Sequence, residues 1–384
     1  MEQWTRMRAA DFIDFNPRMS IKKGAVATKV AMDKLQPFTK RIPETEKAVF
    51  SGGSKFRNGD TIMARITPCL ENGKTAFVDI LREDEVAFGS TEFIVMRAKE
   101  GISDPQFIYY LATSPSFRNI AIKSMVGSSG RQRVQQSVLN DLIMKVPSLE
   151  DQKKISSVFC VLDQKIALNN EINDNLQQQA AALFSSLYDR SNTEVGFTDL
   201  IQILGGGTPK TGENTYWNGN IAFFTPKDVG TPYTLITEKT ISKEGLSHCN
   251  SRLYPVNTVF VTARGTVGKV GMSGVPMAMN QSCYALVGKE THQLLVYFYT
   301  LKAVDRLKHK ASGAVFDAIT TRDFESEQIM KLSDDDATAF LRVAEPMFQE
   351  VLNNNIENLR LSTLRDSLLP KLMSGEIDVS AVQL

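Results

Sequence analysis

Arginine, lysine and asparagine gather in one short loop in each half of this sequence. The segment RITPCLENGK directly follows the strand-like TIMA, and TARGTVGK has the same plan in the second half. Guanidinium and ammonium groups suit phosphate oxygens and the O6 and N7 of guanine, so such loops can approach a DNA groove. The alternative is a solvated hairpin tip. Because the feature occurs twice, with Arg264 matching Arg65, we favour proximity to DNA for Arg65, Asn72, Lys74, Arg264 and Lys269.

A second loop, GSSGRQRVQQ at 127–136, is rich in glycine and serine and offers further readers of bases. Glutamine can pair bidentately with adenine and arginine with guanine. Its counterpart in the second half, ASGAVFDAIT, has neither residue type, so we expect the two halves to read different bases. For any single residue the alternative is a flexible exposed loop. The candidates are Arg131, Gln132, Arg133 and Gln135 in the first half and Thr208, Lys210 and Lys227 in the second.

Motifs of self-contained enzymes are absent from the sequence. GGGTPKTG, at 205–212, invites a phosphate-loop interpretation, but proline and leucine stand where the motif needs its two glycines. The chain has no N-P-P-Y or D-P-P-Y tetrapeptide of amino-methyltransferases, no G-x-S-x-G and no H-E-x-x-H. Its four cysteines form no C-x-x-C pair, and its three histidines lack ligand spacing. We therefore expect no catalytic residues, no metal site and reduced thiols.

Composition indicates an ordinary globular protein of two or three domains. The chain has 384 residues, of which 42% are hydrophobic and 23% charged. No apolar run approaches a membrane span and the start does not resemble a signal peptide, so cytoplasm is the expected location. The net charge of +1 conceals segments of +5 (1–150), −1 (151–190), +2 (191–333) and −5 (334–384). Binding to DNA would therefore need clustered basic groups or help from a partner.

The elements that must position these loops occur twice. VLDQKIALNNEINDNL and MFQEVLNNNIENL are both amphipathic and rich in asparagine, and aligning Leu168 with Leu352 also aligns Ile172 with Ile356, an offset of 184. Aromatic helices, PQFIYYLAT and LLVYFYTL, and strand–loop–strand patterns precede both. Each half is thus predicted to be a mixed α/β globule followed by a long helix. We assign the tyrosines of the aromatic helices to the core rather than to base stacking.

The first long helix is predicted to begin at Ser148, which forms a capping box with Asp151, and to run without Gly or Pro to Tyr188. The second begins at 333–336, but Pro346 should kink or split it and Pro370 should end it, so the helices should differ in length. Apolar residues and asparagines at spacings of three and four predict a pairing seam. Its members are Leu162, Ile166, Asn169, Asn173, Leu176, Leu183, Leu352, Ile356 and Leu359.

These half-apolar helices must be buried, and the repeat supplies both partners in one chain. We therefore favour antiparallel pairing within the chain, although a coiled-coil contact between two copies is the alternative. Polar asparagine in a seam costs stability but fixes register.

Several segments together resemble the specificity subunit of type I DNA restriction–modification enzymes. RDSLLPKLMSGEIDV resembles that family's C-terminal ending, and LEDQKKISSVFCVLDQKIALNNEINDNL its central conserved helix. GGGTPKTGENTYWNGNIAFFTPKDV resembles the opening of a second recognition domain, and ARITPCLENGKTAFV with FGSTEFIVMR the core of a first. The resemblance covers nearly the whole chain, with the motifs in the family's order.

The resemblance implies an α+β fold with a pseudo-twofold duplication: recognition domains at 1–147 and 191–332, and spacer helices at 148–190 and 333–384. Each domain would read one half of a bipartite, asymmetric DNA site, and the helices would set the spacing. Two modification subunits would supply S-adenosylmethionine for adenine methylation, and a restriction subunit that uses ATP and Mg²⁺ could join, with no cofactor in this chain. The alternatives are a coiled-coil adaptor without base readout and a stand-alone methyltransferase, which the missing catalytic motifs disfavour.

Overall fold

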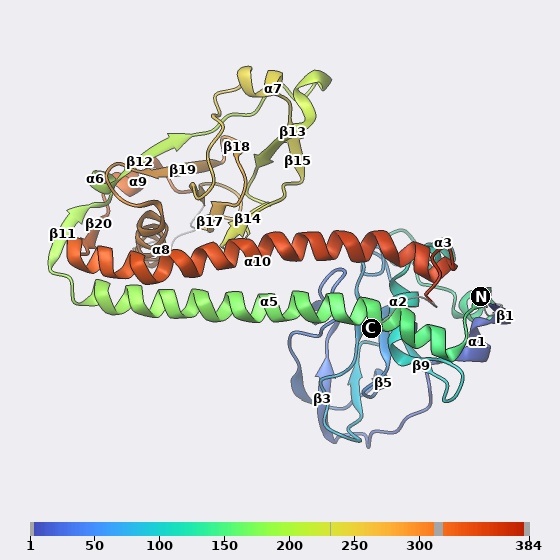
Figure 1. Cartoon of the computed structure of the whole chain (residues 1–384). Helices are drawn as coiled ribbons and strands as arrows, with labels where there is room; N and C mark the ends of the chain where they lie inside the picture. The colour runs from blue at the N-terminus through green and yellow to red at the C-terminus, as the bar shows by residue number, and fades with distance from the viewer. Residues whose placement is uncertain (1–3, 231, 311–317, 380–384) are drawn as a thin grey trace. The chain divides into compact units, whose positions relative to one another are not determined.

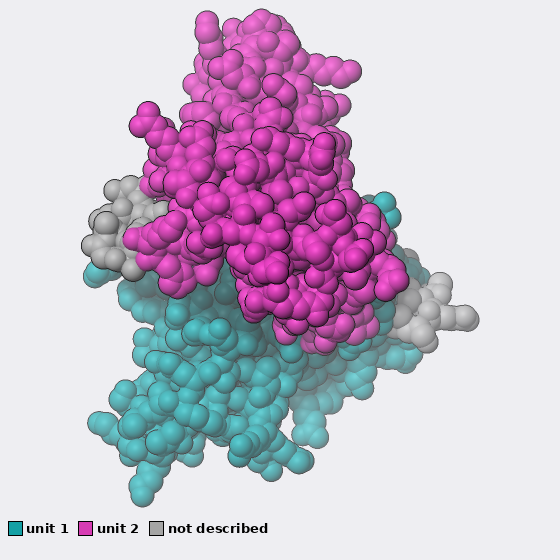
Figure 2. Space-filling model, turned by 90° about the vertical axis from the view of Figure 1, so that its left-hand side faces the viewer, with its two compact units in different colours: residues 1–167, 360–384 teal, residues 168–359 magenta. Residues whose placement is uncertain are grey.

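The computed structural model describes residues 4–230, 232–310 and 318–379. The chain divides into two compact units, which Figure 2 colours separately. Unit 1 comprises Met1–Ala167 with Arg360–Leu384, and unit 2 comprises Leu168–Leu359. Each unit therefore contains one α/β domain and a part of each long helix.

The domain of unit 1 consists of two four-stranded sheets, a two-stranded pair and short helices. Its strands are β1 (Thr5–Arg8), β2 (Ile13–Phe15), β3 (Val26–Val30), β4 (Glu46–Val49), β5 (Ser54–Phe56), β6 (Thr61–Ala64), β7 (Thr75–Phe77), β8 (Ala87–Gly89), β9 (Phe93–Ala98) and β10 (Ile143–Val146). The sheets have the orders β2-β9-β6-β7 and β4-β3-β8-β5, while β1 pairs with β10. All four residues of β6 are buried, which suits its central position.

The domain of unit 2 repeats this plan. Its strands are β11 (Thr193–Gly196), β12 (Ile201–Gly205), β13 (Trp217–Phe224), β14 (Tyr233–Thr234), β15 (Lys239–Ile241), β16 (Val259–Thr262), β17 (Val270–Ser273), β18 (Met277–Met279), β19 (Cys283–Gly288) and β20 (Gln328–Lys331). The sheets have the orders β12-β19-β16-β17-β14 and β15-β13-β18, and β11 pairs with β20. The buried strand β16 takes the place of β6. A parallel pair, β3–β8 in unit 1 and β13–β18 in unit 2, recurs in the second sheet of each domain.

Further helices complete each domain. In unit 1 they are α1 (Ala9–Phe12), η1 (Met32–Lys34), α2 (Pro105–Thr113), α3 (Pro115–Lys123) and α4 (Gln136–Asn140). In unit 2 they are α6 (Phe197–Leu200), η2 (Asn214–Tyr216), α7 (Lys243–Ser247), α8 (Gln293–Lys310) and α9 (Thr321–Glu325). The aromatic helices α2 and α8 lie in the two main cores, and Tyr109, Tyr110, Tyr297 and Tyr299 are buried. The prediction that these tyrosines belong to the core is confirmed.

The two long helices are α5 (Leu149–Asp189) and α10 (Asp334–Ser374), each of 41 residues (Figure 1). Both predicted caps are present: the amide of Asp151 donates to Ser148 Oγ at 3.1 Å, and the amide of Asp336 donates to Ser333 Oγ at 3.1 Å. β10 and β20 lead directly into these caps, so the connection from the domain to the long helix is the same in both units.

The prediction that Pro346 splits the second helix, that Pro370 ends it and that the helices differ in length is wrong. α10 runs through both prolines to Ser374. A proline removes one backbone hydrogen bond and crowds the carbonyl four residues earlier, at a cost of about 3 kcal/mol. Both prolines are exposed, and so is Arg342, whose carbonyl loses its helical partner at Pro346. Burial of the neighbouring Ala344 and Phe348 holds the helix through this defect.

Within unit 2 the helices pair antiparallel, because Asn169 contacts Asn358 while Asn173 contacts Asn354 and Asn355. Asn169 and Asn173 are buried although they are polar. Their side-chain amides bond to asparagines of α10 across the seam, which partly offsets the cost of burying polar groups, although Asn169 Oδ1 has no protein partner. All nine residues of the expected seam are buried or half-buried.

The offset of 184 between the helices is wrong by one residue. Leu168 is 51% exposed, whereas Leu352, which that offset equates with it, is 6% exposed. The cap serines, Ser148 and Ser333, are 185 positions apart, and the same shift equates Asn169 with the buried Asn354. One residue turns a helix by about 100°, so matching the chemically similar leucines placed them on different faces.

Each domain shares a hydrophobic core with its portion of the long helices. In unit 1, Ile155 and Phe159 of α5 and Leu372 of α10 join the core around α2. In unit 2, Phe184 of α5 and Phe340 of α10 join the core around α8. Domain and helices are therefore one packed body within each unit. Among the described residues, no helix is both long enough and apolar enough to cross a membrane.

Candidate nucleic-acid interface

The two basic loops are built on the same backbone frame. The amide of Ala64, at the end of β6, donates to the carbonyl of Lys74 at 3.0 Å, and the amide of Thr262, at the end of β16, donates to that of Lys269 at 3.0 Å. The residue before each lysine is a glycine at positive φ, with values of 73° and 74°. A side chain at these turns would be strained, which accounts for the glycines. Lys74 and Lys269 are therefore equivalent, as the sequence predicted.

The equivalence of Arg65 with Arg264 is wrong by one residue. The backbone amide of Arg65 donates to the backbone carbonyl of Glu92 at 2.9 Å. The corresponding donor in unit 2 is the amide of Ala263, which bonds to the carbonyl of Ser282 at 2.8 Å. Arg264 instead takes the position of Ile66, since each forms the isolated bridge to the returning segment. In extended backbone a slip of one residue turns a side chain to the opposite face. Loops of unequal length concealed this slip in the sequence.

In unit 1 the structure gathers two predicted arginines around a carboxylate. Both Arg133 Nε and Nη2 donate to Glu92, at 2.7–2.9 Å, and this lowers the pKa of Glu92 below its ordinary value. Arg65 adds a weaker electrostatic lowering of the same pKa, and its Nη2 reaches the carbonyl of Val134 at 3.3 Å. The Nε of Arg65 is buried without a protein partner. The result is a fixed guanidinium pair with a net positive charge at the tip of β6.

The other candidates of unit 1 divide into exposed and internally bonded side chains. Asn72, Arg131 and Gln135 are exposed, and Gln132 is half-buried. Lys74 donates its ammonium to the carbonyl of Met32 at 2.9 Å, a bond that ties the loop to the domain.

In unit 2 the candidates are mostly exposed. Thr208, Lys210, Arg264 and Lys269 are exposed, and Lys227 lies 3.6 Å from the carboxylate of Glu238. Thr208 Oγ1 donates to Gln281 Oε1, which fixes the glycine-rich segment against the start of β19. Part of the counterpart loop, 311–317, lies outside the described residues.

Glu92 and Gln281 were missed by sequence reasoning. Both precede the central strands β9 and β19, but neither stands near its partner in the sequence. Glu92 meets Arg133 across 41 positions, and Gln281 meets Thr208 across 73. No local pattern signals such contacts, because the fold alone brings the partners together.

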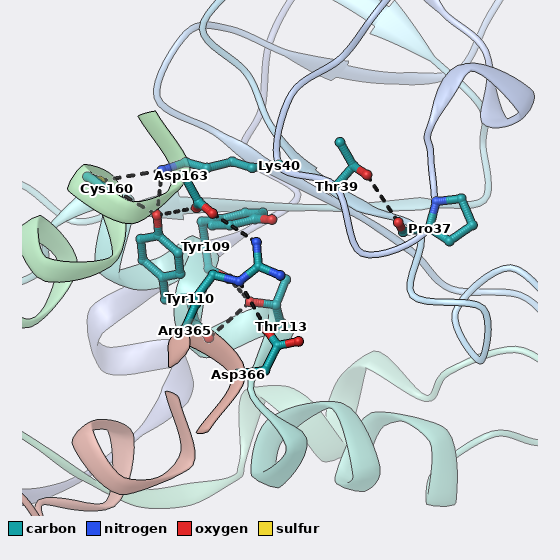
Figure 3. A network of polar contacts seen from close by, with 10 residues as sticks. All are labelled: Pro37, Thr39, Lys40, Tyr109, Tyr110, Thr113, Cys160, Asp163, Arg365 and Asp366. Carbon is teal, nitrogen blue, oxygen red and sulfur yellow. Dashed lines mark hydrogen bonds and ion pairs between the residues drawn. The ribbon is translucent and has the colours of Figure 1, made fainter. Parts of the chain in front are cut away.

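A largely buried polar network joins the domain of unit 1 to its helices (Figure 3). Tyr110 of α2 donates to Asp163 Oδ2 of α5 at 2.6 Å, and Arg365 Nη1 of α10 donates to Asp163 Oδ1 at 2.8 Å. Lys40 donates to the Tyr110 hydroxyl at 2.9 Å. Burial raises the pKa of Tyr110 well above its ordinary range, so the phenol is a donor at every physiological pH. A cavity of about 230 Å³ beside the network is lined by Phe38, Tyr109, Thr113, Arg118 and Leu369, among others.

The corresponding joint in unit 2 is aromatic. Phe184 of α5 stacks on Phe298 of α8, with ring centroids 4.9 Å apart and an interplanar angle of 25°. Phe298 also meets Phe340 and Phe348 of α10 edge-on, at 5.2 and 5.5 Å. Edge-to-face and offset-stacked pairs of this kind stabilise a core beyond their buried area.

The two joints occupy equivalent positions. Residues 104 and 292 directly precede the first residues of α2 and α8, so Tyr109 and Tyr110 correspond to Tyr297 and Phe298. Both ring pairs are T-shaped, at 5.1 and 5.3 Å. On the long helices the shift of 185 equates Asp163 with Phe348 and Arg365 with the buried Ala180. A tyrosine–aspartate–arginine trio in unit 1 thus replaces a phenylalanine–phenylalanine–alanine trio in unit 2.

Comparison with known proteins places this architecture in a family. A model of the type I restriction modification DNA specificity domain matches residues 1–178 and 192–331. The HindI type I specificity subunit of Haemophilus influenzae is 25% identical to the chain, covering 84% of it and 87% of the relative. The EcoAI specificity subunit of Escherichia coli is 30% identical over 38% of the chain and 26% of its own length.

A solved structure shares the fold. The crystal structure of the S subunit of a type I restriction–modification system from M. genitalium aligns with 96% of the chain and 96% of its own chain, with a TM-score of 0.59 at 15% sequence identity. This likeness confirms the predicted fold class, two mixed α/β domains with two long helices. Because the two family matches together span well over half of the sequence, the chain belongs to the type I restriction–modification specificity subunits, the non-catalytic subunits whose two domains recognise DNA sequence.

Proposed function

We propose that each recognition domain reads one half of a bipartite, asymmetric DNA site and that the helix pair sets the gap between the halves. The observation that carries this proposal is the pair of glycine–lysine turns, which end the same central strand in both units with matching backbone bonds. Two copies of one frame, with different side chains at the tips, suit two half-sites of different sequence.

The first domain offers the stronger basic tip. Arg65 and Arg133 flank Glu92, so their guanidinium groups are held before any ligand arrives. A preset fork of donors matches guanine O6 and N7 or a phosphate. In the second domain Ala263, Ala318 and Ser282 hold the equivalent positions, so this centre is neutral, and the basic candidates Arg264, Lys269 and Lys210 are exposed. Different chemistry on one frame supports different half-sites.

Specificity subunits of this family act on DNA in a complex with other subunits. We propose two modification subunits, one for each unit, which carry S-adenosylmethionine and methylate adenine. Where the system also cleaves DNA, a restriction subunit that uses ATP and Mg²⁺ joins them, and the complex acts in the cytoplasm. The chain itself binds no cofactor in this proposal. Its net charge of only +1 supports a division of the DNA affinity between this chain and its partners.

The helices qualify as a ruler because each unit packs its domain into one core with them. A domain that shares a core with a helix cannot slide along it without breaking that core. Lengthening both helices at matching points should therefore move the half-sites apart and leave their bases unchanged.

The test inserts four helix-forming residues after Ala167 and four after Leu359, where the two units divide both helices. The insertion adds about 6 Å of rise and, beyond one full turn, about 40° of rotation. B-DNA advances about 3.4 Å and about 34–36° per base pair, so the gap should grow by one or two base pairs.

Methylated adenines are then mapped in cells that express the variant with its modification subunits. Insertion into α5 alone is the control, and it should reduce methylation because the seam no longer matches. A changed base preference with an unchanged gap would contradict the ruler.

A further inference from the structure

The asparagine contacts between α5 and α10 obey the internal twofold of the chain. Asn169 donates to Asn358 at 2.9 Å, and the symmetry-related Asn354 donates to Asn173 at 2.9 Å. Asn358 donates to Asn170 at 2.8 Å, and the related Asn173 donates to Asn355 at 2.9 Å. Donor and acceptor directions are also preserved. Each bond in this ladder therefore has a twin with the helices exchanged.

Because the asparagine bonds are symmetric, they do not favour pairing of α5 with α10 over pairing of either helix with a second copy of itself. If α5 met a second copy of α5 in antiparallel orientation, Asn169 could bond to the second Asn173 and repeat the observed pattern. The same holds for two copies of α10 through Asn354 and Asn358. Glu357 departs from this pattern, because it accepts a bond from Asn169 at 2.7 Å whereas Ile172 holds the related position.

The trio in unit 1 does distinguish the helices. Asp163 of α5 and Arg365 of α10 are 13% and 19% exposed and bond at 2.8 Å. In a pair of two α5 helices, Asp163 would face Ala180, and in a pair of two α10 helices, Arg365 would face Phe348. Asp366 lies 3.0 Å from Arg365 on the same helix, so this contact is present whether α10 pairs with α5 or with a second α10. It therefore does not favour one partner helix over the other.

We propose that the Asp163–Arg365 pair, with Tyr110, selects pairing of α5 with α10 over pairing of each helix with a second copy of this chain. This goes beyond the reading of DNA: it concerns which helices assemble. The first domain and α5 precede α10 along the chain, so a newly made α5 can meet another α5 before its own partner exists. A buried charge left without its partner shifts a pairing equilibrium by about 100-fold, which corresponds to about 3 kcal/mol.

The test moves one arginine between the helices of the full-length chain. The variant Ala180→Arg with Arg365→Ala keeps the composition of the protein but makes α5 complementary to itself, since Asp163 then faces Arg at position 180 of a second copy. The remaining α10 pairs with a second α10 through Phe348 and alanine. Light scattering at micromolar concentration should report a monomer for the natural chain and a dimer for this variant.

A neutral variant serves as the matched control. Tyr110→Phe, Asp163→Phe and Arg365→Ala copy the trio of unit 2 into unit 1. It should remain folded, with a thermal midpoint close to that of the natural chain, whereas Arg365→Ala alone should lower the midpoint clearly. Each protein is then refolded together with a differently tagged copy of itself. The neutral variant should give at least about tenfold more mixed dimer than the natural chain does.

Two outcomes would overturn the proposal. The first is a folded, monomeric arginine-transfer variant. The second applies even if that variant does not fold: co-refolded copies of the neutral variant form no more mixed dimer than copies of the natural chain. In the second case the trio serves stability alone and does not select a partner.

Discussion

In unit 1 the helix that faces the recognition domain carries Asp163, and in unit 2 the equivalent position carries Phe348. Around the first lie Tyr110 and Arg365, joined by bonds of 2.6 and 2.8 Å; around the second lie Phe298 and Ala180. The backbone plan is the same, so the fold does not dictate the chemistry of the joint. It requires only that the three positions suit one another.

The loops show the same independence. Arg65, Glu92 and Arg133 form a charged cluster in unit 1, at positions where unit 2 has Ala263, Ser282 and Ala318. The order of four main-sheet strands (β2-β9-β6-β7 and β12-β19-β16-β17), the glycine turns and the helix caps were kept after the duplication. The side chains that meet at the joint and at the loop tips diverged. This contrast predicts which substitutions affect the halves equally and which do not.

The largest effect should come from the aromatic joint. Phe184→Ala removes a fully buried ring that contacts Tyr188, Phe298, Tyr299 and Phe340. We expect a loss of about 4 kcal/mol in the free energy of unfolding of unit 2. The matched change in unit 1, Leu369→Ala, should cost about 2–3 kcal/mol because the side chain is smaller. Denaturant titration measures both, and equal losses would mean that the two joints do not differ as described.

Breaking the polar joint should come next. Arg365→Ala leaves the largely buried Asp163 with its tyrosine partner but without its cation, and we expect a loss of about 3 kcal/mol in unit 1. The matched substitution Ala180→Gly in unit 2 removes no ion pair and should cost about 1 kcal/mol through helix propensity. Thermal unfolding compares the two. A loss below that of the glycine control would show that the Asp163–Arg365 bond contributes little.

The caps should behave alike in both halves. Ser148→Ala and Ser333→Ala each remove one bond to a first-turn amide, at the same distance of 3.1 Å. Each should cost about 1 kcal/mol. Hydrogen exchange of the amides of Asp151 and Asp336 reports each helix end separately. Protection lost at one end only would indicate that the two helix starts are not equivalent.

The smallest effect concerns acid. Hydrogen bonds from Thr28 and Lys47 lower the pKa of Glu85 to about 2, from an ordinary value near 4.5. A depressed pKa stabilises the folded state above pH 4.5, and this contribution is lost as the pH falls towards 2. Because the carboxylate is partly exposed, we expect no more than about 1 kcal/mol. The natural chain should lose this stability between pH 4.5 and 2, and Glu85→Gln should not. Acid titrations of the free energy of unfolding of both proteins test this, and equal losses would contradict the role given to Glu85.

The sequence was sufficient for the elements whose signals are local. It predicted both helix starts from Ser148 and Ser333 and the core role of Tyr110 from its helical context. It failed at Pro346, because the cost of a proline was weighed without the burial of neighbouring residues, and that burial depends on tertiary structure. The sequence alignment also matched Arg65 with Arg264 because both residues are arginines. The backbone hydrogen bonds, which define the register of the two loops, show that they are not equivalent.

The candidate site was only partly accessible from the sequence. The basic residues were identifiable because the residue type alone shows that a side chain is basic. Their internal partners were not, since Arg133 and Glu92 lie 41 positions apart and Asp163 and Arg365 lie 202 apart. Contacts at such separations follow from the assembled fold, and no local pattern encodes them.

The central claim, that each unit reads its own half-site, is tested most directly by mapping methylated adenines for Arg133→Ala and Arg264→Ala. Each variant is expressed with its modification subunits beside the natural chain. Arg133→Ala should relax base preference in one half-site and Arg264→Ala in the other, by about 1–3 kcal/mol of discrimination, with the gap unchanged. If both variants alter the same half-site, or if either alters both halves together, the two units do not read separate halves.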